Sequence, residues 1–159
     1  MPTTSSFTEA LLKGLALLGL ASCFLLPALY YQDLPAEIPR HFNIKGQADA
    51  YSGKEIIWAM PLLCLLLYAG ITLMIRKAHL MNYPTGDGRP HSAQQQKGMK
   101  RFLLVLNSLT TLFFGYITWS MIRTALESQA GLGTFTVLLL VLVFLGTVAF
   151  YMMRTRKTA

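Results

Sequence analysis

The chain has 159 residues, of which 53% are hydrophobic and 13% are charged, and its formal net charge is +7. This composition is too apolar for an ordinary soluble domain and predicts one membrane domain over residues 1–159. The positive charge does not indicate nucleic-acid binding, because the basic residues cluster between apolar runs and not on the face of a soluble scaffold.

Four apolar segments, at about residues 9–29, 55–75, 101–126 and 132–153, dominate the chain. Each approaches or exceeds the roughly 20 residues that a helix needs to cross the hydrocarbon core of a bilayer. We therefore expect an all-α integral membrane protein, a four-helix transmembrane bundle with a structured extracytoplasmic loop between helices 1 and 2, at residues 30–54. Two cysteines inside the apolar runs, Cys23 and Cys64, are expected to be small packing residues.

The distribution of Lys and Arg predicts the orientation of the bundle. The segment from Arg76 to Arg101 holds six basic residues, and the C-terminal tail adds Arg154, Arg156 and Lys157. Because Lys and Arg accumulate on the cytoplasmic side, we expect both termini inside and loop 30–54 outside. Four aromatic residues near the expected outer ends of the first two helices fit a belt at the outer membrane interface: Tyr30, Tyr31, Tyr51 and Trp58.

Prolines and glycines predict the course of loop 30–54. Pro35 and Pro39 fix φ, lack an N–H group and push the preceding residue toward extended conformations, so an extended strut is expected there. Gly46 and Gly53 permit turns with positive φ, which would fold the segment back on itself before the next helix.

Two serines mark expected helix starts. Ser52 and Glu55 form a capping-box pattern, in which each side chain bonds a backbone N–H of the other residue, and this predicts Ser52 as the N-cap of the second helix. Ser92 is the expected cap of a helix that continues into the third span.

Loop 30–54 contains the residue types for acid–base chemistry, namely His41 with Asp33, Glu37 and Asp49. The spacing contains neither paired histidines nor a nucleophile elbow, so we expect no catalytic residue, no metal and no cofactor. A structural or partner-contacting role, small-ligand binding and catalysis remain open in that order. If Gly46 reverses the chain, His41 and Asp49 should approach each other. The remaining histidines, His79 and His91, are expected to be solvated loop residues.

Polar residues inside the spans are few and uncharged. Asn107, Thr111 and Thr118 share one face of the third helix, which indicates hydrogen bonds between helices or, alternatively, a polar pathway for a solute. We expect Asn107 to face other helices, because an unpaired amide in lipid is costly. Gly14 and Gly19 in the first span are expected to allow close helix packing.

The pattern LPxxIPxHFNxxGxxDxxxxK over residues 34–54, followed by a capped helix, closely resembles the N-terminal membrane domain of the SdpI-like family, the immunity proteins against the sporulation-delaying toxin. The similarity extends from the first span into the segment around Tyr116 and Trp119. The resemblance implies a bacterial plasma (inner) membrane protein with this loop outside. It places the family motif on ten positions: Leu34, Pro35, Ile38, Pro39, His41, Phe42, Asn43, Gly46, Asp49 and Lys54.

These observations together predict a non-enzymatic membrane protein with a binding or interaction role related to toxin immunity or signalling. Its expected partners are the lipid bilayer and a secreted peptide toxin or another membrane protein. Two alternatives are an accessory subunit of a membrane transporter, which would need a wet cavity at Asn107 and Thr111, and a membrane enzyme that uses His41 and Asp49.

Overall fold

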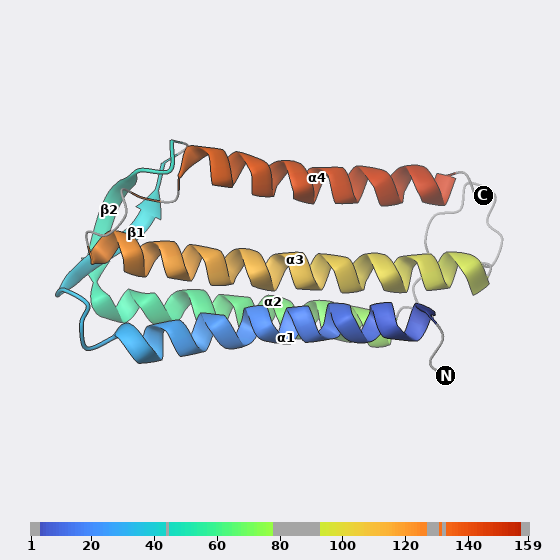
Figure 1. The fold of residues 1–159 in the computed structure, drawn as a ribbon, viewed down its shortest axis with the longest axis horizontal. Coiled ribbons are helices and arrows are strands. Elements are labelled where there is room, and N and C mark those ends of the chain that lie inside the picture. The colour runs from blue at the N-terminus through green and yellow to red at the C-terminus, as the bar shows by residue number, and fades with distance from the viewer. Residues whose placement is uncertain (1–3, 44, 78–92, 127–130, 132, 157–159) are drawn as a thin grey trace.

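The architecture is a helical bundle with a small β-hairpin at one end (Figure 1). The computed structural model describes residues 4–43, 45–77, 93–126, 131 and 133–156. Over these residues the order of elements is α1 (Thr4–Tyr30), β1 (Glu37–Phe42), β2 (Ala48–Gly53), the 3-10 helix η1 (Lys54–Trp58), α2 (Ala59–Arg76), α3 (Ala93–Ala125) and α4 (Thr134–Arg156). The hairpin caps the end of the bundle opposite to the start of α1 and the end of α4.

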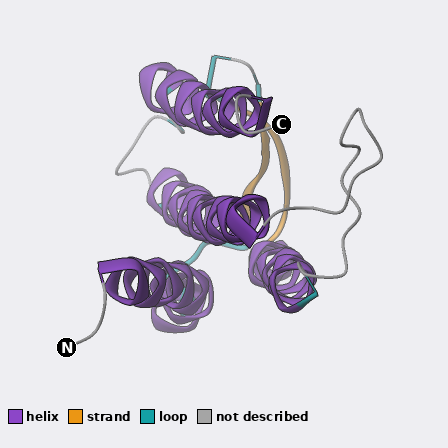
Figure 2. Ribbon diagram, turned by 90° about the vertical axis from the view of Figure 1, so that its right-hand side faces the viewer, coloured by secondary structure: helices purple, strands orange, loops and turns teal. Residues whose placement is uncertain are grey.

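Helix α3 is the centre of the bundle. Helices α1 and α2 pack against it on one side and α4 packs on the other, so α4 lies far from α1 (Figure 2). The apolar side chains of α4 are largely exposed, Phe135 to 80% and Leu142 to 66%, as expected for a helix whose outer surface meets lipid instead of protein.

Within the described residues, three helical segments are long and apolar enough to cross a membrane: Ser6–Tyr30, Lys54–Arg76 and Ala93–Ala125. The expected spans at 9–29, 55–75 and 101–126 correspond to them. The fourth expected span, 132–153, coincides with α4, whose described apolar stretch is the shorter Leu138–Tyr151. The chain is therefore a helical membrane protein.

Small residues let α1 and α3 approach closely. A Cβ atom on Gly19 would lie 2.7 Å from the backbone of Thr111 and Leu112, and one on Gly115 would collide with Oγ of Ser22. The expectation of close packing is thus correct at Gly19. It is wrong at Gly14, where a Cβ would meet nothing within 4 Å.

The expectation of an all-α fold is wrong for the loop between the first two helices. The extended segment after Pro35 continues as strand β1, which pairs antiparallel with β2 from Glu37 opposite Gly53 to Phe42 opposite Ala48. A proline-restrained extended segment needs a hydrogen-bonding neighbour for its remaining backbone groups, and the reversed chain provides it.

The predicted start of the second helix is also wrong. Ser52 lies in β2 opposite Ile38, and its side chain makes no capping bond. Gly53 instead occupies the N-cap position with φ −53°, so the positive φ expected there is absent. Because the strand holds Ser52 in its ladder, the chain enters the helix later, through the 3-10 turn of η1.

An apolar cluster joins the hairpin to the bundle. Its buried members come from the chain before β1, from β1, from η1 and from α3: Leu34, Ile38, Ile57, Met121 and Ile122. Burying a side chain of this size stabilises a fold by roughly 1.5–3 kcal/mol, so the cluster holds the hairpin in a defined position on the helices.

Candidate functional site

The hairpin turn is organised by one side chain. Oδ1 of Asn43 accepts hydrogen bonds from the backbone N–H groups of Lys45 at 2.9 Å and Gln47 at 3.1 Å. Gly46 takes φ 73°, a conformation that costs other residues about 1–2 kcal/mol, and donates its N–H to the carbonyl of Asn43. The expected reversal at Gly46 is confirmed, and Asn43 is its second determinant.

Two opposed irregularities shape the strands beyond the turn. In the register, Arg40 is the extra residue of β1 between Pro39 and His41, and Asp49 is the extra residue of β2 between Ala48 and Ala50. A residue without a partner in the ladder can direct its side chain differently from its neighbours. The two offsets cancel, so pairing resumes on both sides.

These irregularities bring His41 and Asp49 together. Nδ1 of His41 lies 2.6 Å from Oδ1 of Asp49, and the two side chains remain 66% and 41% exposed. A carboxylate can only accept, so His41 donates from Nδ1 and its Nε2 remains for another contact. The expected approach of these residues is confirmed, and the pair is presented to solvent.

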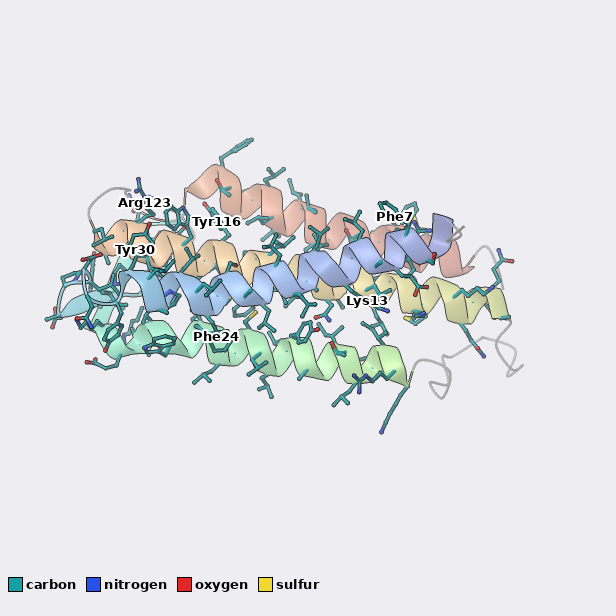
Figure 3. The ribbon with its side chains drawn as sticks, turned by 60° about the horizontal axis from the view of Figure 1, so that its bottom comes forward. Phe7, Lys13, Phe24, Tyr30, Tyr116 and Arg123 are labelled. Atoms are coloured by element: carbon teal, nitrogen blue, oxygen red, sulfur yellow. The ribbon has the colours of Figure 1, made fainter. Side chains whose placement is uncertain are left out.

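A basic residue fastens the base of the hairpin to α1. Nζ of Lys54 donates to the backbone carbonyl oxygen of Tyr31 at 3.2 Å. The same Nζ lies 4.7 Å from the centroid of the Tyr31 ring. The ring of Tyr31 also contacts Trp58, with 6.2 Å between centroids. Tyr30 and Arg123 lie at the same end of the bundle (Figure 3).

The predicted motif residues therefore divide by environment. Leu34, Ile38 and Pro39 are buried, while Asn43, Gly46 and Lys54 hold the turn and the base of the hairpin. Phe42 is half-buried and packs against the apolar cluster. Exposed side chains at the remaining motif positions are Pro35, His41 and Asp49.

Sequence reasoning assigned Tyr51 to an aromatic belt at the membrane interface and missed its place on the exposed face of β2. Tyr51 lies two residues beyond Asp49 in β2, on the same face of the strand, and is 54% exposed. The alternation of small and larger residues in Ala48–Gly53 was the available signal for this strand, and the capping-box pattern at its end concealed it.

The polar residues of α3 face the bundle interior. Nδ2 of Asn107 donates to Oγ1 of Thr72 on α2 at 3.1 Å, as expected for a residue that contacts other helices. The hydroxyls of Thr111 and Thr118 donate to carbonyls of their own helix, and Sγ of Cys23 on α1 lies 3.9 Å from the carbonyl oxygen of Thr111.

Two interhelical contacts of α3 were not anticipated. Oγ of Ser108 lies 2.7 Å from the carbonyl oxygen of Leu12, and Nζ of Lys100 donates to Oε2 of Glu9 at 2.7 Å. Both contacts join residues of α1 and α3 that are distant in the sequence. The spacing of residues within one helix does not reveal such contacts.

Cys23 and Cys64 are buried and free of disulfides. Within the part of the chain that the structure describes, no group of three or more His, Cys, Asp and Glu side chains could hold a metal ion. His79, His91, Ser92 and Lys157 lie outside the described residues.

The fold and this site define a class: a helical membrane protein with a β-hairpin between its first two helices, anchored at its base and exposed at His41 and Asp49. Within the chain, residues 18–65 match a domain of unknown function, DUF1648. The match covers the C-terminal half of α1, the whole hairpin, η1 and the start of α2. No curated protein and no solved structure matches the chain.

Proposed function

We propose that the protein is a non-enzymatic recognition protein of the bacterial plasma membrane, in which the outer surface of the hairpin contacts a secreted peptide or another membrane protein. The exposed contact between His41 and Asp49 is the observation that carries this proposal. Tyr51 extends the same surface with an aromatic ring, a residue type enriched where proteins bind other proteins.

The magnitude of the interaction supports recognition over stability. A polar contact this exposed contributes at most about 1 kcal/mol to folding, whereas the buried cluster beneath it contributes several times more. His41 and Asp49 are therefore dispensable for folding, which leaves their side chains available to a partner.

The asymmetry of basic residues supports placing this surface outside the cell. Residues 30–54 contain three basic residues, against six from Arg76 to Arg101. The resemblance of residues 34–54 to the SdpI-like immunity proteins supports a peptide toxin as the partner.

The test uses cells sensitive to a sporulation-delaying peptide toxin. His41→Ala and Asp49→Asn should reduce protection at least tenfold while the amount of protein in the membrane stays unchanged. Glu37→Gln is the matched control, because Glu37 is an exposed acidic residue at the base of β1 and lies outside the pair. Loss of abundance and protection in equal proportion would make the pair structural, and full protection by both variants would contradict the proposal.

A further inference from the structure

A cavity of about 720 Å³ opens between α1, α2 and α3 at the end of the bundle away from the hairpin. Four cationic side chains from these three helices line it: Lys13, Arg76, Lys97 and Lys100. Lys13 extends from α1 on the side of the neighbouring helices (Figure 3). Basic residues are common at this end of membrane helices, but here they converge on one concavity.

The charge in this cavity is only partly neutralised. Glu9 pairs with Lys100, and the described lining contains no Asp or Glu. The first turn of α3 contributes Ala93 and Gln96 to the lining, so the positive end of the helix dipole adds to the side-chain charges. The combination creates a strongly anion-attracting site.

A polar side chain also lines the cavity. Asn107 is 3% exposed and lines the inner part, and its Oδ1 has no hydrogen-bond partner while its Nδ2 bonds Thr72. Leaving a buried acceptor unpaired costs about 1–3 kcal/mol, so the lining contains one polar group whose hydrogen-bonding capacity is only partly used. Apolar side chains beside it, including Leu17 and Ile75, suit a hydrocarbon portion.

We propose that this basic cavity binds a phosphate ester, with the phosphate between the cations of α1, α2 and α3. The volume lies within the range of ligand sites, about 300–1,000 Å³. The glycerophosphate group satisfies this chemistry, and it is available from the phosphatidylglycerol headgroup or from soluble glycerol 3-phosphate. The site is independent of the role proposed for the hairpin.

The experiment compares two double variants of the full chain in detergent. Arg76→Gln with Lys97→Gln removes two cations from the lining, whereas Lys77→Gln with Arg101→Gln removes one Lys and one Arg from adjacent exposed positions outside it. Native mass spectrometry measures retention of phosphatidylglycerol against phosphatidylcholine, and a thermal-shift titration measures binding of glycerol 3-phosphate. Circular dichroism confirms that both variants fold.

At roughly fivefold in affinity for each basic side chain, the first pair should weaken binding about tenfold to thirtyfold and the second pair less than about threefold. A larger loss of phosphatidylglycerol binding in the first double variant than in the second supports a lipid ligand. The same difference seen for glycerol 3-phosphate alone supports a soluble ligand. Equal losses in both double variants would indicate general attraction to a basic surface and overturn the proposal. Absence of the contrast for both ligands would overturn it as well.

Discussion

Single residues in the hairpin have separable tasks, although they are neighbours in the sequence. Ile38 is fully buried against α3, while His41, three residues later, is two-thirds exposed at the side-chain level. The bulge at Arg40 separates these environments, because it lets His41 turn outward after two buried positions. Stability and recognition therefore depend on different side chains of one strand.

Asn43 tests this separation at the turn. Asn43→Ala removes the acceptor of two backbone hydrogen bonds and should destabilise the turn by roughly 1 kcal/mol, because each exposed bond contributes little net free energy. Hydrogen exchange at the amides of Lys45 and Gln47 should accelerate about fivefold. Asn43→Asp keeps the acceptor oxygen and is the control. Equal exchange in the alanine variant and the original chain would show that Gly46 alone holds the turn.

At the scale of elements, the contact between α1 and α3 depends on small side chains at the crossing. In a membrane the hydrophobic effect does not drive one helix onto another, so close van der Waals contact and hydrogen bonds have to do so. Gly19 and Gly115 permit the contact, and Ser108 adds a hydrogen bond to the backbone of α1.

Gly19→Ala should destabilise the bundle by about 1–3 kcal/mol, because the added Cβ meets backbone atoms of Thr111 and Leu112 that cannot rotate away. Gly14→Ala is the matched control in the same helix and should be neutral or stabilising by up to about 1 kcal/mol, since its surroundings are open. Thermal unfolding in detergent measures both variants. Equal stability of the two variants would contradict the close contact at Gly19.

At the scale of the whole molecule, two features lie at opposite ends of the bundle: the exposed pair on the hairpin and the basic cavity near the start of α1. Helix α3 passes from one to the other and lines both the cavity and the cluster beneath the hairpin. The proposed orientation assigns the first feature to the outer surface and the second to the cytoplasmic leaflet.

Cysteine labelling tests this orientation. In a background without Cys23 and Cys64, an impermeant thiol reagent added to intact cells should label Gln47→Cys on the hairpin but not Lys77→Cys at the end of α2. The expected contrast follows from the excess of Lys and Arg between the end of α2 and the start of α3. Labelling with the opposite preference would reverse the topology, and cell lysis should make both sites reactive.

The sequence by itself determined the helices, since a run of apolar residues as long as a bilayer is thick has few other stable arrangements. It also determined the reversal at Gly46, whose φ of 73° few other residues adopt. Only the tertiary structure decided that residues 48–53 form a strand and that Ser52 belongs to it instead of capping a helix. Likewise, the cavity beside Asn107 is formed by three helices that are far apart in the sequence but pack together in the fold. Local propensity reports on near neighbours, whereas strand pairing and helix packing depend on contacts with distant residues, which the sequence pattern does not contain.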